Sequence, residues 1–308
     1  MAPQLPGTRS LRVLASAGKH LNFSRAAADL GLTPAAVSHQ IKEMEDQLGL
    51  LMFARTSRTI RLTEAGEVMY EAAVDTLDLL GRAAAKARKL SRGVSQLRLT
   101  TEGLFASKWL LPRLDRFRRD CPGIDLRFDI SERLRSFEQD DIDVAVRFGA
   151  GSYPGLVCNR LFDNMIVPVC SPRLLKEGLP LNNPRDLFHH TLAQIEWSQP
   201  GASWPNWRMW MAAAGIPDFD DGNCLIFEAS TYIIQAAIEG SVVALCDSSM
   251  VATDLAEGRL VRPFEFGIKM APEYAYHLVY PAGMADEPRI VAFRDWILNE
   301  ARLTPTHG

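Results

Sequence analysis

The chain has 308 residues, of which 47% are hydrophobic and 23% charged, so it can bury sizeable cores and is neither fibrous nor disordered. Its net charge of -3 hides a division: residues 1–62 hold eight Lys/Arg against four Asp/Glu, residues 63–92 hold five of each, and the remainder holds 21 against 28. A small basic head on an acidic body predicts that only the head meets a polyanion.

The cysteines and the first residues indicate the compartment. The five cysteines are odd in number, far apart and never in a C-x-x-C arrangement, so we expect small buried side chains in a reducing compartment, without a zinc site or disulfides. The first ten residues, MAPQLPGTRS, lack the apolar core of a signal peptide, and no segment approaches about 18 uncharged apolar residues. A cytoplasmic protein without a membrane segment is expected.

The stretch FSRAAADLGLTPAAVSHQIKEMEDQLG, residues 23–49, predicts two helices joined by a three-residue turn. Ser24 is expected to cap the first helix, and Gly31 to end it in the left-handed conformation. Thr33 would cap the second helix, with Pro34 in its first position. The small Ala27 lets the two helices approach closely, as a helix-turn-helix requires.

The second of these helices has one apolar and one polar face. Its buried stripe is formed by Val37, Ile41, Met44 and Leu48. On the opposite face, small or polar side chains at the N-terminal end can enter a DNA major groove, where apolar groups contact thymine methyls and polar groups bond to base edges. The expected base readers are Pro34, Ala35, Ser38 and His39. The alternative is an ordinary helical hairpin with a polar outer face.

Residues 51–63, LMFARTSRTIRLT, predict a short hairpin that carries Arg55, Arg58 and Arg61. A basic wing beside a recognition helix can clamp phosphates, which positions a protein on DNA without reading its sequence. Each arginine alone could equally be a solvated turn charge.

Residues 64–90 are almost free of helix breakers and predict one long helix of roughly 40 Å. Apolar positions recur in it at alternating spacings of three and four, which is typical of a coiled-coil seam. The seam comprises Tyr70, Ala73, Leu77, Leu80, Ala84 and Ala87. We expect this helix to pair with a second chain, since a two-fold dimer suits a palindromic site; the alternative is that it packs on its own chain. Residues 91–96 would form a hinge.

From residue 97 onward, short β runs alternate with helical patterns, which predicts an α/β arrangement. The expected strands cover residues 97–102, 124–131, 142–148, 165–171, 192–197, 223–229, 242–247 and 274–281. The expected helices cover residues 107–119, 204–215, 230–239 and 286–302.

Ligands of open α/β sheets lie beyond the carboxyl ends of strands and near helix N-termini. Residues 100–107, 147–149 and 228–231 fit that description and would line a cleft. The polar groups there are the hydroxyls of Thr100, Thr101 and Ser230, the carboxylates of Glu102 and Glu228, and the guanidinium of Arg147. Each could instead be a helix cap or a strand-end ion pair.

The remaining conspicuous residues indicate core packing or no functional site. Trp204, Trp207, Trp210 and Met211 lie at helical spacing and should pack a lobe core. The His189-His190 pair has no further ligands at metal spacing, and no nucleophile elbow, Walker-type loop or dinucleotide fingerprint occurs. We expect no catalytic residue, no metal and no cofactor.

Residues 23–67, from FSRAAADLG to LTEAGE, resemble the N-terminal winged helix-turn-helix of LysR-type transcriptional regulators. WLLPRLDRFRRDCPGIDL, DVAVRFGAGSYPGL, RLFDNMIVPVCSP and LAEGRLVRPF resemble the effector domain of the branch that contains the glycine-cleavage activator and the β-lactamase regulator. The resemblance implies an α+β multi-domain protein with two periplasmic-binding-protein-like α/β lobes, joined by crossovers near residues 160–167 and 264–268.

The resemblance also implies a domain division. Residues 1–62 would form the winged helix-turn-helix, residues 63–92 the linker and dimerisation helix, and residues 93–308 the effector-binding domain. Within that domain, lobe I would comprise about 93–163 and 267–302, and lobe II about 164–266.

Functional positions follow from the resemblance residue by residue. DNA contacts match Ser24, Thr33, Pro34, Ala35, Ser38, His39, Gln40 and Lys42, together with the arginines of the wing. Effector-pocket positions match Thr101, Glu102, Leu104, Arg147, Glu228, Ser230 and Tyr274, beside Thr100. The implied partners are operator DNA, a small-molecule effector, a second copy in a homodimer or homotetramer, and RNA polymerase.

The expected function is sequence-specific transcriptional regulation controlled by a small molecule bound between the two lobes. One rival is an α/β two-lobed enzyme, for which Glu102 and His277 would be the best catalytic pair. Another is an architectural DNA-binding protein that needs no ligand.

Overall fold

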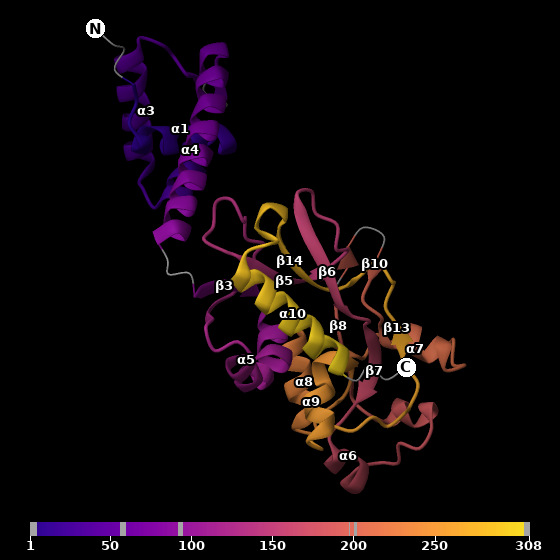
Figure 1. The fold of residues 1–308 in the computed structure, drawn as a ribbon. Helices are drawn as coiled ribbons and strands as arrows, with labels where there is room; N and C mark the ends of the chain where they lie inside the picture. Colours follow the sequence, from indigo (N-terminus) through magenta and orange to yellow (C-terminus); the bar gives the residue numbers. More distant parts are fainter. Residues whose placement is uncertain (1–4, 56–59, 92–94, 197, 200–201, 305–308) are drawn as a thin grey trace. The chain divides into compact units, whose positions relative to one another are not determined.

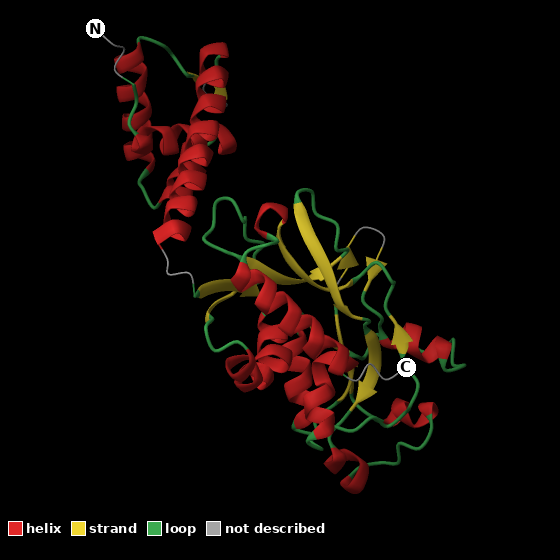
Figure 2. Cartoon of the chain, in the orientation of Figure 1, coloured by secondary structure: helices red, strands yellow, loops and turns green. Residues whose placement is uncertain are grey.

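The computed structural model describes residues 5–55, 60–91, 95–196, 198–199 and 202–304 (Figure 1). The chain divides into two compact units, Met1–Ser91 with Glu138–Asp141, and Arg92–Phe137 with Ile142–Gly308. Helices dominate the first unit, whereas the second combines sheets and helices (Figure 2).

The first unit is a helical head with a two-stranded wing. Its elements are α1 (Thr8–His20), α2 (Phe23–Leu30), α3 (Pro34–Leu48), β1 (Phe53–Arg55), β2 (Ile60–Leu62) and α4 (Glu64–Ser91). Helix α1 is not anticipated by the sequence patterns, yet its Leu14 lies at the centre of the core with Val37 and Ile41 of α3. The predicted stripe of α3 is therefore buried as expected, with Leu48 at its edge.

The helix caps of the head match the prediction with one correction. Gly31 ends α2 in the left-handed conformation (φ 65°), and the Thr33 side chain caps α3 by accepting a hydrogen bond from the Ala36 amide. The cap of α2 is Asn22, not Ser24: the Asn22 side chain accepts from the amides of Ser24 and Arg25. Asn22 is as good a capping residue as serine, and it stands outside the helix, where a cap must be.

Two contacts fix the wing and α4 to the rest of the head. The carboxylate of Glu45, buried in α3, accepts hydrogen bonds from the amides of Met52 (2.7 Å) and Phe53 (3.1 Å). A methyl group at Gly66 would overlap the carbonyl oxygen of Met52, so α4 can start against the residue before β1 only because residue 66 has no side chain.

Helix α4 is the predicted long helix, but its seam has two surroundings. Ala73 is completely buried in the head core, and the ring of Tyr70 lies so close to α1 that only glycine fits at position 18. Further along the seam, Leu80 is 47% exposed, and Ala84 and Ala87 are also exposed. The first part of the seam therefore packs on its own chain, which was the alternative interpretation, and the later part does not.

The second unit contains two five-stranded sheets, one in each lobe. The lobe I sheet has the order β4 (Asp125–Ile130), β3 (Gln96–Thr101), β5 (Val144–Gly149), β14 (Ala275–Pro281), β6 (Leu156–Phe162). Strand β3 is parallel to β4 and β5, whereas β14 is antiparallel to both of its neighbours. The carboxyl ends of β3, β4 and β5 therefore meet at one edge of the sheet.

The lobe II sheet has the order β11 (Leu225–Phe227), β8 (Leu192–Ile195), β12 (Val243–Asp247), β7 (Met165–Val169), β13 (Ile268–Lys269). The chain passes from lobe I to lobe II between β6 and β7, within the expected range. It returns between β13 and β14, after Lys269, which is later than the expected residues 264–268 because β13 still pairs with β7. The two passages touch: the Met270 amide donates to the carbonyl of Asn164 (3.1 Å).

Helices cover both sheets. They are a π-helix (Phe105–Leu110), α5 (Leu114–Asp120), α6 (Pro172–Glu177), α7 (Trp207–Ala213), α8 (Ser230–Ile238), α9 (Ser248–Ala256) and α10 (Pro288–Leu303). Short 3-10 turns occupy Leu111–Arg113, Pro184–His189 and Ala282–Met284, and β9 (Ser198–Gln199) pairs with β10 (Ala202–Ser203). The predicted helix 107–119 is thus three successive helical types, and β6, α6 and α9 were not predicted.

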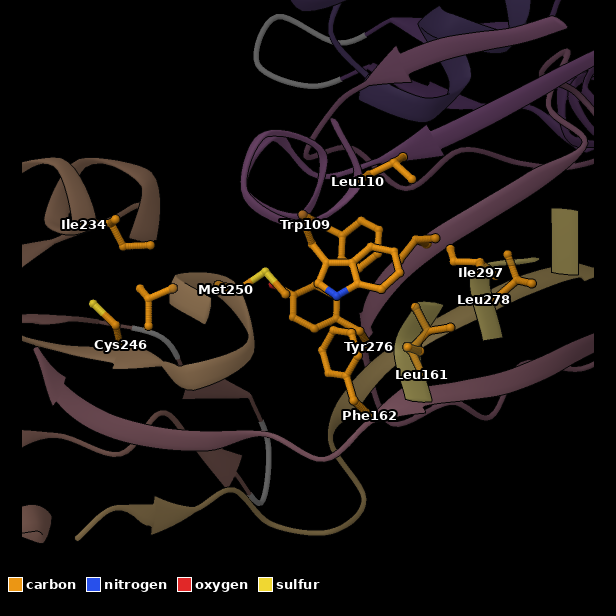
Figure 3. Close-up of a cluster of buried hydrophobic side chains, with 14 of the residues drawn as sticks. Trp109, Leu110, Leu161, Phe162, Ile234, Cys246, Met250, Tyr276, Leu278 and Ile297 are labelled. Carbon is orange, nitrogen blue, oxygen red and sulfur yellow. The ribbon is translucent and has the colours of Figure 1, made fainter. Parts of the chain in front are cut away.

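One hydrophobic core extends through both lobes. Trp109 of the π-helix, Phe162 and Tyr276 belong to lobe I, and Ile234 of α8 and Met250 of α9 reach the same cluster from lobe II (Figure 3). A second core lies on the other face of the lobe II sheet and contains the predicted tryptophans Trp204, Trp207 and Trp210 with Met211. An ion pair also joins the lobes: Lys108 Nζ lies 3.0 Å from an oxygen of Asp254 in α9, whose side chain is 1% exposed.

Within the described residues, no helix combines the length and hydropathy that a membrane span requires. All five cysteines are free, and Cys170 and Cys246 are fully buried. No group of three or more His, Cys, Asp or Glu side chains in the described residues could hold a metal ion.

Candidate functional site

The N-terminal end of α3 presents an exposed face. Pro34, Ala35, His39 and Lys42 are exposed, whereas the opposite face is locked into the head core. The capped N-terminus and the proline in its first turn fix the helix at the point where a recognition helix would enter a groove.

Other predicted DNA contacts have partners within the head. His39 Nδ1 lies 3.5 Å from a carboxylate oxygen of Glu43, one turn further along α3. Gln40, with its amide oxygen oriented toward α1, accepts two hydrogen bonds from Arg9 (2.9 and 3.1 Å). Gln40 therefore braces α3 against α1, while His39 stays exposed.

The remaining predicted DNA contacts lie at the edges of this face. Ser24 is exposed in the first turn of α2, Thr33 is exposed as the cap of α3, and Ser38 is half-buried.

The wing is an antiparallel hairpin in which Arg55 pairs with Ile60 and Arg61 with Ala54. Arg61 is exposed on β2. The side chain of Arg55 and the whole of Arg58 lie outside the described part of the chain.

In lobe I, Arg147 connects three segments at the carboxyl end of the sheet. Its guanidinium donates to the carbonyls of Ser131 (2.8 Å) and Arg133 (3.0 Å) and to Thr100 Oγ1 (2.9 Å). Thr100 in turn donates to a carboxylate oxygen of Asp129 at 3.0 Å. The structure thus brings the predicted residues Thr100 and Arg147 together. The N–H groups of Arg147 that bond here, however, already donate to two backbone carbonyls and to Thr100.

Glu102, directly after β3, is half-buried beside this network. Burial, together with the negative charge of Glu132, raises its pKa to about 7, although Arg147 and a backbone hydrogen bond from Phe148 lower it. This carboxyl group therefore exists in both protonation states near neutral pH.

Two further pocket positions surround Glu102. Thr101 is completely buried, and its hydroxyl has no hydrogen-bond partner in the described structure. Leu104 immediately precedes the π-helix and packs against the core shared by the lobes.

The other predicted pocket residues lie on other segments of the domain. The ring of Tyr274 lies 6.4 Å from that of Phe148 and packs against the second core of lobe II. Glu228 is exposed before α8, and Ser230 is the first residue of that helix. No hydrogen bond or ion pair among the described residues joins Glu228 or Ser230 to the Arg147 network.

Sequence patterns missed several residues of this region. Asp129 lies near the end of β4, and Glu132 follows that strand, which was predicted. A parallel pairing of β3 and β4 would have placed both carboxylates at the same sheet edge as Glu102. Tyr276 is the second residue of a buried strand, β14, and nothing in its pattern distinguishes it from a structural aromatic residue.

The catalytic pair suggested for an enzyme does not form. His277 Nδ1 lies 2.9 Å from the carbonyl oxygen of Ala275 in its own strand, and the opposite edge of the ring faces Gly151. Burial lowers the pKa of His277, which favours the neutral imidazole. No hydrogen bond connects it with Glu102 in the part of the chain that is described.

Two family profiles match the chain. Residues 8–67 match the bacterial regulatory helix-turn-helix protein of the lysR family, and residues 91–302 match the LysR substrate binding domain. The two matches together extend from α1 into α10.

Named relatives span nearly the whole length. The chain is 38% identical over 303 residues to the glycine cleavage system transcriptional activator of Escherichia coli (strain K12), covering 98% of this chain and 96% of that protein. It is 33% identical over 302 residues to the transcriptional activator AmpR of Pseudomonas aeruginosa, covering 97% of each.

Solved structures agree with this assignment. The effector domain of AmpR from Pseudomonas aeruginosa covers 68% of this chain at 30% identity, with 96% of that domain matched and a TM-score of 0.54. A full-length AphB variant has the same fold over 94% of this chain and 97% of its own, with 20% identity and a TM-score of 0.51. The chain belongs to the LysR family of transcriptional regulators and combines a helix-turn-helix head with an effector-binding domain.

Proposed function

We propose that α3 is the recognition helix and that Pro34, Ala35, Ser38 and His39 read base edges in the major groove. The observation that carries this proposal is the exposure of the N-terminal face of α3 opposite a face that is fixed in the core. Apolar Pro34 and Ala35 suit thymine methyl groups, and Ser38 and His39 can form hydrogen bonds. None of the four offers the bidentate pattern of arginine on guanine, so DNA shape and several half-sites together supply much of the specificity.

Contacts to phosphates surround this helix in the proposal. Ser24, Thr33, Gln40 and Lys42 would position the head, and the wing arginines Arg55, Arg58 and Arg61 would clamp the backbone of the DNA. The exposure of Lys42 and Arg61 supports these roles. Gln40 would act indirectly, since it holds Arg9.

Footprinting on the DNA upstream of the chain's own gene, at two salt concentrations, tests this assignment. A Ser38→Ala, His39→Ala double variant should lose a roughly palindromic protected site. Asp46→Ala, on an exposed position near the other end of α3, is the matched control and should leave the protection in place. Protection by the double variant that equals that of the wild type would remove α3 from its proposed role.

The proposed domain division is residues 1–62 for DNA binding, 63–92 for the linker helix and 93–308 for effector binding. We further propose that the later part of the α4 seam pairs with a second chain, giving a homodimer or homotetramer. The exposure of Leu80, next to the seam positions Ala84 and Ala87, supports this pairing, because two-stranded coiled coils bury such side chains between chains.

Sedimentation measurements test the dimer. Leu80→Asp should lower the oligomeric state, because it places a charge in the seam. Leu79→Asp is the matched control: Leu79 is adjacent and equally apolar, but it lies outside the proposed seam. Dissociation by both variants alike would show that the assigned register is wrong.

The effector is proposed to bind at the lobe I edge defined by Thr100, Thr101, Glu102, Leu104 and Arg147. Glu228, Ser230 and Tyr274 would complete the site from lobe II and the returning strand. A ligand that contacts both lobes shifts their equilibrium only by its differential affinity, typically about 1 to 3 kcal/mol. Such a shift would change the geometry of the oligomer on its operator and the access of RNA polymerase in the cytoplasm.

A further inference from the structure

A charge pair joins the π-helix of lobe I to α9 of lobe II. Lys108 Nζ lies 3.0 Å from a carboxylate oxygen of Asp254, whose side chain is almost fully buried. The attraction between two such charges is stronger in this partly dry space than between two charges in water. The next residue after Lys108 is Trp109, which belongs to the apolar core shared by the lobes. The pair is therefore a polar contact between the lobes at the border of that core.

The carboxylate of Asp254 has a second cation in its own lobe. Arg259 Nε lies 2.8 Å from the other oxygen of Asp254, and the Arg259 amide donates to the Asp254 carbonyl oxygen at 2.9 Å. Opening a buried ion pair is costly when it leaves one charge without a partner. Release of Lys108 leaves Asp254 paired with Arg259, and the Lys108 side chain is already 18% exposed. This pair can therefore open without leaving a buried charge unpaired.

The N-terminal end of α9 is tied to the two passages between the lobes. Asp247 caps α9 by accepting from the Ser249 amide at 2.9 Å, and it also accepts from the side chain of Asn164 in the first passage. The carbonyl of Asn164 accepts from the Met270 amide of the return passage. Helix α9 is thus attached to both passages at its start and to the π-helix further along.

Two buried polar atoms at the start of α9 lack partners. Ser248 Oγ and Asn164 Oδ1 have no hydrogen bond within the part of the chain that the structure describes. Buried polar atoms in native proteins are nearly always bonded, and leaving them unbonded costs free energy. The N-terminal end of α9 therefore opposes its present position, whereas the ion pair of Asp254 with Lys108 stabilises that position.

The apolar contact between the lobes can adapt to a small movement. Helix α9 contacts the π-helix, and Met250 of α9 belongs to the same cluster as Trp109 (Figure 3). A methionine side chain is unbranched and flexible, so it accommodates changes in packing. A π-helix is rare and frequently found at functional sites. This one begins directly after Leu104, which links Lys108 to the proposed effector edge within about one helical turn.

We propose that the Lys108–Asp254 pair is a latch between the lobes. It holds α9 in its present position, and its release lets α9 slide along the π-helix and changes the geometry of the oligomer on operator DNA. Small sliding movements of packed helices are an established form of conformational change and leave a shared core intact. This inference rests on the proposed effector control, because a ligand at the effector edge would act on the latch through the π-helix.

Hydrogen exchange of the full-length protein, followed by mass spectrometry, tests the latch without a ligand. Lys108→Met removes the charge and should speed exchange in the π-helix and at the Met270 amide at least about fivefold, the lower end of typical coupling between sites. Strands β3 and β8, inside the two sheets, should exchange as in the wild type. Arg259→Met is the matched control, because it removes the other cation of the same carboxylate. It should leave the Met270 amide unchanged.

Two further measurements separate a latch from a contact that only stabilises the fold. Lys108→Arg keeps the charge and should exchange as the wild type does. In operator footprinting, Lys108→Met should protect a segment of altered extent, whereas Arg259→Met should give the wild-type pattern. Circular dichroism establishes that each variant is folded, and Lys108→Gln replaces Lys108→Met if the methionine variant does not fold.

Three results would overturn the proposal: exchange at the wild-type rate after loss of the Lys108 charge, equal acceleration in Arg259→Met, or acceleration that extends to β3 and β8. A wild-type footprint in Lys108→Met would likewise exclude a latch that acts on DNA binding. Protection by the wild-type protein is measured separately. Its absence would count against the proposed regulator, whereas intact protection with unchanged exchange in Lys108→Met would count only against the latch.

Discussion

The proposed recognition face of α3 and the carboxyl edge of the lobe I sheet differ in how their polar side chains are partnered. On α3 the polar residues Lys42 and His39 are exposed, and the ion-pair partner of His39, Glu43, belongs to the same helix. At the lobe I edge the guanidinium of Arg147 is buried and its donors are bonded to the protein. Exposed cations suit binding to DNA, because they stay hydrated until they replace the counterions condensed on the phosphates. A charge in a partly buried site is costly unless hydrogen bonds within the protein already partner it.

Removing the buried charge of lobe I should have the largest effect. Arg147→Met leaves two backbone carbonyls and Thr100 without their donor and should lower the free energy of unfolding by about 3 to 5 kcal/mol. Denaturant unfolding of the full chain measures it. Arg133→Met removes an exposed guanidinium from the same loop and should change the stability by no more than about 0.5 kcal/mol. Equal losses in the two variants would mean that Arg147 is not the internal anchor of this edge.

Glu45 is the exception within the head, because it is a buried carboxylate below an otherwise exposed polar surface. Glu45→Ala leaves the amides of Met52 and Phe53 without an acceptor and should cost about 2 kcal/mol in thermal or denaturant unfolding. Glu45→Gln keeps an acceptor oxygen and should recover most of this loss. If glutamine were as harmful as alanine, the charge rather than the hydrogen bonds would hold the wing.

The dependence of stability on pH sharpens the contrast at Glu102. Its folded-state pKa of about 7 lies above the ordinary value of 4.5, so ionisation opposes folding. The penalty is absent below about pH 4.5, grows between the two pKa values and is complete above about pH 7. Relative to the wild type, Glu102→Gln should therefore gain about 1 to 2 kcal/mol at pH 8 and nothing at pH 4. A difference that does not vary with pH would refute this electrostatic account.

The smallest effects are expected on α3. Lys42→Ala should weaken binding to all DNA sequences alike and reduce the slope of log affinity against log salt by about one. Gln40→Ala should leave that slope unchanged and lower the stability of the head by only about 1 kcal/mol, because Gln40 bonds to Arg9. A reduced slope for Gln40→Ala would place its side chain on DNA after all.

The sequence predicts the head better than the lobes. In α3, helical spacing and the Thr33-Pro34 start suffice to separate the buried from the exposed face. The same local signals misplaced one cap, because Asn22 and Ser24 are both good capping residues and only the path of the chain decides between them. Helix α1 was overlooked, although it supplies Leu14 to the core.

In the lobes, the strands follow from their apolar runs, but their partners depend on contacts between distant residues. The pairing of β13 with β7 shifts the return to lobe I beyond Lys269, and two residues of strand are too short to leave a pattern. The roles of Thr100 and Arg147 are similarly invisible locally, because their hydrogen bonds join β3, β5 and the loop after β4. Helical periodicity assigns a face, but it does not say which charges meet across a sheet edge.

The core that contains both Trp109 and Met250 has a consequence for how the effector domain folds. Each lobe lends side chains to a single apolar cluster, and the chain passes twice between the lobes. A fragment holding lobe II alone would expose the surface of α9 that now contacts the π-helix of Trp109, and such apolar surfaces drive aggregation. The two lobes should therefore melt together as one cooperative unit rather than as two separable modules.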